Sequence, residues 1–301
     1  MNSRHIAVIG SSNTDMVIKT TKLPAPGETI LGGDFFMFPG GKGANQAVAA
    51  ARLDGAVSLI AKTGNDVFGK QARDIFENDH INTDFLLTDN NHPSGIALIT
   101  VDSQGENCIV VAPGSNSYLG KEDIDLAREE ILKSDLILMQ LEIPLETVEY
   151  AASIAYDAGI KVILNPAPAS KISDALLSKL YLITPNETEA ELITGIPVKD
   201  SESAENAARN LHQHGVKVVI ITLGSKGALL YSEGKAVMIP TPKVTAVDTT
   251  AAGDVFNGAI AVAIAEGFTL EKAVEFACKA AAISVTRMGA QASAPYRKEL
   301  H

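Results

Sequence analysis

The stretch Val247-Asp248-Thr249-Thr250-Ala251-Ala252-Gly253-Asp254-Val255-Phe256-Asn257-Gly258 precedes an apolar helical run over residues 259–264. Small residues ahead of a helix let backbone N–H groups approach a ligand closely. The N-terminus of the helix adds unpaired donors and a partial positive charge, which together favour a bound anion. A carboxylate beside such a site, here Asp254, can take a proton from a hydroxyl while the anion is transferred. The stretch therefore indicates phosphoryl transfer to an alcohol.

The composition of the chain narrows the class of protein. Its 301 residues, 46% hydrophobic and 20% charged, suit one large α/β domain or a domain with an appendage. No apolar run reaches the roughly 18 residues that span a bilayer. Met1 leads almost directly into a strand-like run, so neither a membrane partner nor a signal peptide is expected. The two cysteines, Cys108 and Cys278, predict two free thiols in a cytoplasmic protein. The net charge of −11, without a basic cluster, argues against a nucleic-acid partner.

Short β-branched runs alternate with longer amphipathic stretches through most of the chain. Continuous apolar strands separated by helices indicate a parallel sheet that is covered on both faces. We therefore predict an α/β fold with a doubly wound, mostly parallel sheet and helices on both faces. Ligands of such sheets bind at the carboxyl ends of the strands. The strand candidates are residues 6–9, 57–61, 136–141, 162–164, 182–184 and 218–222, and the helix candidates include 121–133, 145–158 and 203–214.

Two segments, residues 16–38 and 94–111, lack the helices of this pattern. The second predicts a hairpin with a polar turn after residue 101. We expect the two pieces, about 14–39 and 92–112, to form a small antiparallel β-sheet inserted into a single domain of residues 1–301. Above the strand ends this sheet would be a lid that excludes water, and its uncovered apolar face predicts a homodimer through the lid sheet. The alternative is that these two segments form a β-structure on the surface that has no functional role.

A glycine-rich segment, Pro39-Gly40-Gly41-Lys42-Gly43-Ala44-Asn45-Gln46, stands directly before a predicted helix over residues 47–53. It lacks the spacing of a Walker A loop. Its glycines permit close backbone approach, and Lys42 and Asn45 offer donors of the type that hold sugar hydroxyls. A purely structural turn before a helix has the same pattern.

The segment Gly10-Ser11-Ser12-Asn13-Thr14-Asp15 follows the first predicted strand without a dinucleotide-binding fingerprint. Asn13 and Asp15 supply an amide and a carboxylate at a strand end, which suits a polyol. A polar turn that uses these side chains as local caps is the alternative.

Two further segments have both a structural and a functional interpretation. Thr184-Pro185-Asn186-Glu187-Thr188-Glu189 has the spacing of a capping box, and Asn186 and Glu189 could instead hold a hydrated Mg²⁺ near phosphates. Thr222-Leu223-Gly224-Ser225-Lys226-Gly227 closes a predicted strand as a hairpin turn or as a nucleotide-contacting loop. Nothing local decides between these two.

Taken together, the segments closely resemble the ribokinase branch of the ribokinase-like (PfkB-type) carbohydrate kinase family, in order from Ile6 to about Pro295. The segments 40–46 and 248–254 resemble its two signature regions, and their joint occurrence is far more specific than either alone. The resemblance implies a ribokinase-like fold and ATP-dependent phosphorylation of D-ribose at its 5-hydroxyl, giving D-ribose 5-phosphate and ADP.

The resemblance also implies roles for individual residues. Asp254 is similar to the catalytic base, and the backbone amides of Ala251, Ala252, Gly253 and Asp254 would form the anion hole. Because a helix N-terminus favours the ionised carboxylate, we expect Asp254 to be an intrinsically weak base. The implied sugar-binding positions are Asn13, Thr14, Asp15, Gly41, Lys42, Gly43, Asn45, Glu142 and Asp254.

ATP, Mg²⁺ and a K⁺ activator are the implied cofactors. Cys278 stands where family members can carry a histidine near the adenine, and Met288 replaces a residue that is often basic. The implied ATP positions are Asn186, Thr222, Leu223, Gly224, Ser225, Lys226, Gly227, Gly253 and Cys278, with Glu189 tied to Mg²⁺. A tail loop would bind K⁺, largely through backbone oxygens, with Asp248, Thr250, Ser284, Arg287, Gly289 and Ser293.

Other functions stay open at this point. A 2-deoxy-D-ribose kinase, or another sugar or nucleoside kinase of the same family, is the nearest alternative. A catalytically inactive sugar-binding regulator would have lost Asp254 or Gly253, and both are present. A nicotinamide oxidoreductase would need the glycine fingerprint that the first strand lacks.

Overall fold

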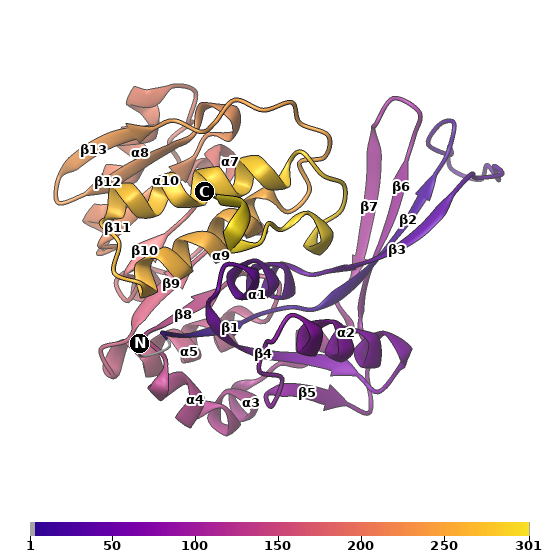
Figure 1. The fold of residues 1–301 in the computed structure, drawn as a ribbon, viewed down its shortest axis with the longest axis horizontal. Coiled ribbons are helices and arrows are strands. Elements are labelled where there is room, and N and C mark those ends of the chain that lie inside the picture. The colour runs from indigo at the N-terminus through magenta and orange to yellow at the C-terminus, as the bar shows by residue number, and fades with distance from the viewer. Residues whose placement is uncertain (1–3, 301) are drawn as a thin grey trace.

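Nine strands form the larger of two sheets in the computed structural model, which describes residues 4–300 (Figure 1). Their order is β13-β12-β11-β10-β9-β8-β1-β4-β5, parallel from β11 to β5 and antiparallel across β11, β12 and β13. Each predicted strand is present. The strands are β1 (His5–Ile9), β4 (Ala56–Gly64), β5 (Leu86–Asp89), β8 (Leu136–Met139), β9 (Lys161–Leu164), β10 (Leu182–Ile183), β11 (Val218–Thr222), β12 (Ala228–Ser232) and β13 (Lys235–Ile239).

Helices cover both faces of this sheet, which confirms the predicted fold class (Figure 1). Alternate side chains of a buried strand enter different cores. In β1, Ile6 and Val8 join the cluster under α1, α2, α9 and α10, whereas Ala7 and Ile9 join the cluster under α3 to α8. The helices are α1 (Lys42–Arg52), α2 (Val67–Asn78), α3 (Lys121–Leu126), α4 (Arg128–Lys133), α5 (Leu145–Asp157), α6 (Asp174–Leu177), α7 (Glu187–Thr194), α8 (Ser201–Gln213), α9 (Ala252–Ala265) and α10 (Leu270–Ser284), with short 3₁₀ turns η1 (Gly114–Tyr118), η2 (Gly224–Lys226), η3 (Gln291–Ser293) and η4 (Arg297–Leu300).

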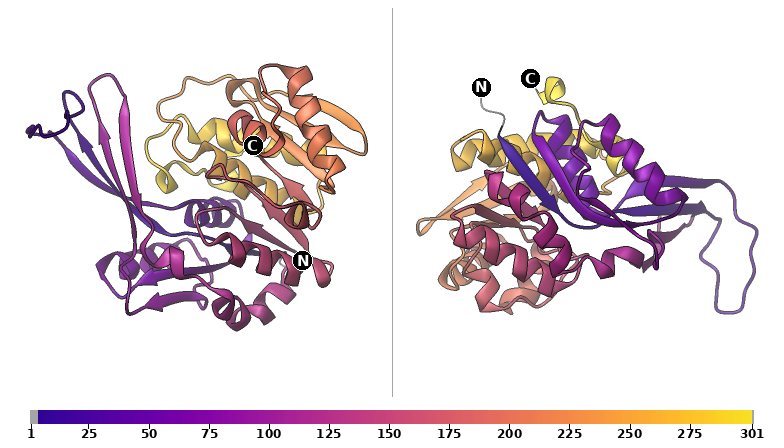
Figure 2. Two further views of the ribbon diagram at one scale, coloured as in Figure 1. Left: turned by 180° about the vertical axis from the view of Figure 1, so that it is seen from behind. Right: turned by 90° about the horizontal axis from the view of Figure 1, so that it is seen from below.

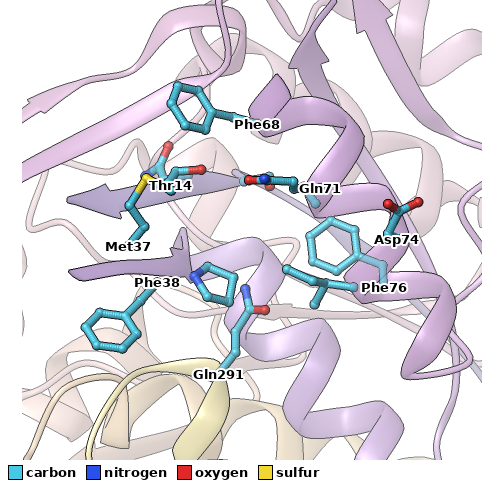
Figure 3. Close-up of a pocket in the computed structure, with 13 residues that line it drawn as sticks. Thr14, Met37, Phe38, Phe68, Gln71, Asp74, Phe76 and Gln291 are labelled. Carbon is cyan, nitrogen blue, oxygen red and sulfur yellow. The ribbon is translucent and has the colours of Figure 1, made fainter. Parts of the chain in front are cut away.

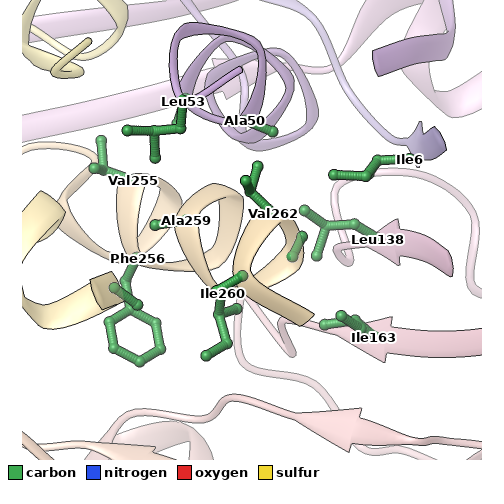
Figure 4. Close-up of a cluster of buried hydrophobic side chains, with 14 of the residues drawn as sticks. Ile6, Ala50, Leu53, Leu138, Ile163, Val255, Phe256, Ala259, Ile260 and Val262 are labelled. Atoms are coloured by element: carbon green, nitrogen blue, oxygen red, sulfur yellow. The ribbon is translucent and has the colours of Figure 1, made fainter. Parts of the chain in front are cut away.

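Helix α9 is buried along almost its whole length, which explains why its sequence is apolar without a polar face. It packs against α1, α10 and the sheet. Figure 4 shows Ala50 of α1, and Leu53 directly after that helix, above Val255 and Ala259 of α9. Because α1 and α9 each begin at one of the two signature segments, their packing brings these segments together.

Two predicted helices have other bounds in the structure. The run over residues 121–133 is two helices, because the backbone turns at Ala127 (φ −90°, ψ 3°). The turn keeps Ile124, Ala127 and Ile131 fully buried. Helix α1 begins at Lys42 rather than at residue 47, directly after Gly41, whose φ of 89° reverses the chain.

The smaller sheet projects from the body of the molecule (Figures 1 and 2). Its strands are ordered β3-β2-β6-β7, and β2–β3 and β6–β7 are antiparallel as expected. The central β2–β6 pair is parallel, so the expectation of an all-antiparallel sheet is wrong at this pair. A parallel pair needs a long crossover, which residues 41–94 provide through α1, β4, α2 and β5. The strands are β2 (Asn13–Lys19), β3 (Phe35–Gly40), β6 (Gly95–Val101) and β7 (Asn107–Ala112).

Three further observations concern the predictions from composition. Cys108 and Cys278 are both free thiols, as predicted. Within residues 4–300, no helix combines the length and the apolar character needed to cross a membrane. The expectation of no signal peptide rests partly on residues 1–3, which lie outside the described residues.

Candidate functional site

Asp254 lies in the first turn of α9 and is only 5% exposed. Ala251 precedes the helix in the left-handed region (φ 58°, ψ 13°), which turns the chain into the helix. Both carboxylate oxygens of Asp254 accept hydrogen bonds of 2.9 Å from α1, one from Asn45 Nδ2 and one from Gln46 Nε2. Two amides of one signature segment therefore fix the carboxylate of the other.

Burial raises the pKa of Asp254, although the charge of Lys42 and the two amide hydrogen bonds act in the opposite direction. The expectation that the helix N-terminus makes Asp254 a weak base is therefore wrong. The sequence predicts that Asp254 stands at a helix N-terminus, which favours its ionised form. It does not predict that folding removes the carboxylate from water, and this desolvation has the larger effect on the pKa. A raised pKa makes the ionised carboxylate a stronger proton acceptor.

Lys42 lies at the centre of the acidic groups of the site. Burial lowers the pKa of Lys42, because it disfavours the charged ammonium group. Nearby carboxylates outweigh this effect and raise the pKa overall; they belong to Asp254, Glu142, Glu189 and Asp15. The backbone N–H of Lys42 donates to Glu142 Oε2 at 2.9 Å. The result is a set of charged donors and acceptors of the type that binds several hydroxyls of one polyol.

Asp15 gives the site a predicted pH dependence. Burial, followed by repulsion from Glu142 and Asp254, raises the pKa of Asp15 from 3.8 to about 6. A carboxyl whose pKa is raised by folding binds its proton more tightly in the folded chain. Its contribution to the free energy of unfolding therefore falls as the pH rises from 3.8 to about 6.

We expect the Asp15→Asn variant to gain Tm relative to the parent across that window and to keep a constant gain at higher pH. The reason is that asparagine removes the buried charge. Thermal unfolding followed by circular dichroism at a series of pH values measures the difference. The matched control is Asp174→Asn, whose side chain is 81% exposed. A Tm difference that does not change with pH would contradict this pKa assignment.

The structure divides the predicted sugar positions between two faces of a strand. Successive residues of β2 point to opposite sides, so Asn13 and Asp15 share one face and Thr14 points to the other. Thr14 therefore lies away from the Asp15 carboxylate. The remaining sugar positions gather around the start of α1 and the end of β8: Gly41, Lys42, Gly43, Asn45 and Glu142.

Sequence reasoning missed a chain of buried amides behind Asp254. Gln46 Nε2 also donates to Asn165 Oδ1 at 3.0 Å, and Gln46 Oε1 accepts from Gln140 Nε2 at 2.6 Å. Gln46 and Gln140 are fully buried. Gln140 and Asn165 each follow an apolar run and Gln46 ends the glycine-rich segment, but nothing in the pattern shows that these three side chains meet.

A cavity of about 720 Å³ adjoins the start of α9. Most of the predicted ATP positions line it, whereas Leu223 and Lys226 do not. Its other walls come largely from residues 241–246 and from α10, where no motif pointed to a ligand. The predicted positions in its lining are Asn186, Thr222, Gly224, Ser225, Gly227, Gly253 and Cys278.

Several of these positions have a structural role as well. Gly224 lies in the turn that joins β11 to β12, so the segment is both a hairpin turn and part of the cavity wall. The capping box is present: the Asn186 side chain accepts from Glu189 N at 2.8 Å, and Glu189 Oε2 accepts from Asn186 N at 2.9 Å.

Burial raises the pKa of the Cys278 thiol to about 11, so this wall of the cavity is a neutral thiol at pH 7.

The tail loop lies against the segment before α9. Asp248 joins the two, because its carboxylate oxygens accept from Thr250 N and Gly289 N, each at 2.9 Å. The Arg287 guanidinium forms an ion pair with Glu299. The hydroxyls of Ser284 and Ser293 donate to backbone carbonyls of their own turns.

Comparison with known proteins identifies the family. The sequence profile described as "pfkB family carbohydrate kinase" matches residues 3–297. Ribokinase of Haemophilus influenzae is 47% identical over 98% of this chain and 96% of its own length. Deoxyribokinase of Salmonella typhimurium is 41% identical over 96% of this chain and 95% of its own length.

A solved structure supports the same assignment. Arabidopsis thaliana ribokinase, in complex with ribose and ATP, superposes with a TM-score of 0.92 and is 33% identical, covering 100% of this chain and 98% of its own. Fold and sequence therefore agree with the predicted resemblance. The chain belongs to the pfkB family of carbohydrate kinases.

Proposed function

We propose that this protein transfers the γ-phosphoryl group of ATP to the 5-hydroxyl of D-ribose, giving D-ribose 5-phosphate and ADP. One observation carries the proposal. Gly253 lines the 720 Å³ cavity, and the next residue, Asp254, faces the polar cluster around Lys42. A nucleotide in the cavity and a sugar in the cluster would thus meet at the start of α9.

The chemistry follows from this arrangement. Asp254 takes the proton of the attacking hydroxyl while the new O–P bond forms and the bond to the ADP oxygen breaks. Asn45 and Gln46 hold the carboxylate in place. The amides at residues 251–254 donate to the moving phosphoryl group, although Ala252 N also lies 3.3 Å from the Thr249 carbonyl.

The residues near the cavity fit a hydrated Mg²⁺. Mg²⁺ usually keeps several waters and needs only one or two carboxylates beside the substrate phosphates. Glu189 is 8% exposed, and Asn186 N donates to only one of its carboxylate oxygens. Glu189 would hold the hydrated ion close to the phosphates and would help to balance their charge.

The tail loop gives a prediction about monovalent cations. We propose that K⁺ binds between the tail loop and Asp248 and holds the amides of residues 251–254 in shape. Replacing K⁺ by Na⁺ or by tetramethylammonium is expected to lower kcat. In the Asp248→Ala variant the contacts to Thr250 and Gly289 are lost, and kcat is expected to be low in all three salts. Equal parental rates in the three salts would contradict the proposal.

A second candidate substrate, 2-deoxy-D-ribose, has a specific observation in its favour, the 41% identical deoxyribokinase. The geometry of Asn13 favours ribose. Its Oδ1 accepts from Asn116 Nδ2 at 2.8 Å, which leaves its Nδ2 as a donor toward a sugar hydroxyl. A site that hydrogen-bonds a hydroxyl discriminates strongly against the analogue that lacks it.

Steady-state release of ADP on the two sugars separates these candidates. We expect kcat/KM for D-ribose to exceed that for 2-deoxy-D-ribose by about 100-fold or more. The ratio of kcat/KM for D-ribose to kcat/KM for 2-deoxy-D-ribose should be smaller in the Asn13→Ala variant. A higher kcat/KM for the deoxy sugar would make the second candidate the better one, and activity on neither sugar would refute both.

We further propose that the smaller sheet is a lid on a single domain and the interface of a homodimer. Met37, Leu98 and Val110 lie in one row across the sheet and are 48%, 50% and 62% exposed. Such an uncovered apolar row favours burial against a second copy. Sedimentation should show a dimer that Val110→Glu converts to a monomer, while Val237→Glu on β13, where Val237 is 41% exposed, leaves the dimer intact. A parental monomer would refute the interface.

A further inference from the structure

We propose that Asn116 is a positioning residue that sets the preference of the sugar site for D-ribose over 2-deoxy-D-ribose. It acts through Asn13, by fixing which end of the Asn13 amide faces the 2-hydroxyl of the sugar. This role rests on the proposed function, since it concerns the same site. Asn116 lies in η1, directly after the chain returns from the smaller sheet, and it is only 1% exposed.

The hydrogen bonds of the Asn116 side chain fix the orientation of its amide. Its Oδ1 lies 2.9 Å from Ser12 N, and a backbone N–H can only donate. Its Nδ2 lies 3.1 Å from the carbonyl oxygen of Ser12 and 3.0 Å from that of Pro113, and a carbonyl oxygen can only accept. Exchanging the two ends of the amide would place donor against donor and acceptor against acceptor inside the protein, which is costly.

The fixed amide of Asn116 in turn orients the amide of Asn13. Asn116 Nδ2 lies 2.8 Å from the Asn13 side chain and can only donate, so the atom of Asn13 that faces it is the oxygen, Oδ1. The Nδ2 group of Asn13 is thereby directed away from Asn116. Within residues 4–300 it has no hydrogen-bond partner, and it is not fully covered by the protein, so it can donate to a ligand.

The backbone around this contact leaves space for it. Asn13 pairs with Gly95 of β6, and a Cβ at Gly95 would lie 2.1 Å from Asn13 Oδ1 and 2.3 Å from Asn116 Nδ2. Only glycine at this position therefore permits the hydrogen bond between the two amides. The next side chain of β2, Thr14, points to the other face of the strand, on the side of Phe68 of α2 (Figure 3).

A donor at Asn13 matters because the charged groups of the sugar site are mostly acceptors. Three carboxylates take the protons of sugar hydroxyls and cannot donate to them; they belong to Asp15, Glu142 and Asp254. A hydroxyl has one proton, so a hydroxyl that donates to a carboxylate needs a donor such as Asn13 Nδ2 for its lone pairs. A reversed Asn13 amide would present an oxygen and lose this hydrogen bond. Because 2-deoxy-D-ribose lacks the 2-hydroxyl, its phosphorylation should not depend on the orientation of Asn13.

The ratio of kcat/KM for D-ribose to kcat/KM for 2-deoxy-D-ribose tests this role, because the ratio does not depend on the fraction of enzyme that is folded. In Asn116→Ala we expect it to fall about tenfold or more, through a loss on D-ribose alone. In the double variant Asn13→Ala/Asn116→Ala it should be no lower than in Asn13→Ala, because Asn116 acts through Asn13. The control Asn82→Ala, which removes a side-chain hydrogen bond to Asp84 N in the turn before β5, should keep the parental ratio.

Gly95→Ala tests the same contact without changing either amide. Its Cβ would force Asn13 and Asn116 apart, so the ratio should fall in this variant as well, even if Asn116→Ala does not fold. Gly33→Ala, whose new Cβ makes only an ordinary contact, is the matched control. The parent gives a readout that needs no variant: the side-chain NH₂ signals of Asn13 in nuclear magnetic resonance spectra should shift further with saturating D-ribose than with saturating 2-deoxy-D-ribose.

Three results would overturn the role of Asn116. One is a parental ratio in active Asn116→Ala or Gly95→Ala, or an equal loss on both sugars, which is the mark of a purely structural residue. Another is a double variant whose ratio is lower by the product of the two single effects, since Asn116 would then act independently of Asn13. The last is an equal shift of the Asn13 NH₂ signals with the two sugars. A parent that phosphorylates neither sugar would instead refute the proposed function, and this role with it.

Discussion

Replacing Asp254 by asparagine is expected to lower kcat by about 10²–10⁴-fold, the usual contribution of a general base. Asparagine keeps the size of the side chain but cannot take the proton of the attacking hydroxyl. It also places an NH₂ group against one of the two donors, Asn45 Nδ2 or Gln46 Nε2, that now hold the carboxylate. The sugar should still bind, because the rest of the polar cluster is unchanged.

Kinetics on D-ribose with a coupled ADP assay measure this loss, and sugar binding by calorimetry shows whether affinity is kept. The Asp174→Asn variant changes an aspartate whose side chain is 81% exposed and should keep the parental kcat. Parental turnover in Asp254→Asn would remove the residue from the base role. A loss of sugar binding equal to the loss of kcat would mean that Asp254 acts mainly in binding.

Gly43→Ala is expected to have the second largest effect, on both stability and activity. A Cβ on Gly43 would lie 2.5 Å from Ser11 N and 2.6 Å from Gly10 C, where only backbone could move. Helix α1 would be pushed off the end of β1, at a cost of about 1–3 kcal/mol. Lys42 and Asn45 move with the helix, and a displacement of about 1 Å at a catalytic site lowers kcat/KM on the order of 100-fold.

Thermal unfolding and ADP-release kinetics measure the two effects of this change. Gly33→Ala is the matched control, because the nearest atom to its new Cβ is Lys19 O at 3.4 Å, an ordinary contact. Helix propensity alone predicts that Gly43→Ala would raise the stability, since alanine is a better helix former than glycine; we expect the stability to fall. A Gly43→Ala variant that is more stable than the parent would show that α1 and β1 can separate at no cost.

Local pattern predicted much of the fold. The apolar runs of β1, β4, β8, β9, β10 and β11 stand out because buried parallel strands need no polar alternation. The hairpin of β6 and β7 is visible from its polar turn at residues 102–106. The parallel pairing of β2 with β6 was not predictable, because it depends on where the crossover between them leaves the chain.

The site shows the same division between local and long-range information. Asn45 and Asp254 were predicted from their own segments, and the structure joins them at 2.9 Å. The raised pKa of Asp254 depends on the burial of its carboxylate in the folded chain, which no local pattern reports. Gln46 and Gln140 were missed for the same reason, since a buried amide chain is defined by its partners.

The most direct test of the proposed function is the identity of the product. The purified protein, incubated with ATP, Mg²⁺, K⁺ and D-ribose, should form ADP and a sugar phosphate in equal amounts. Proton–phosphorus correlation spectra should show coupling from the new phosphorus only to the two hydrogens on C5 of the sugar. Coupling to the hydrogen on C1, or hydrolysis of ATP with no sugar phosphate formed, would contradict the proposal that Asp254 activates the 5-hydroxyl of D-ribose.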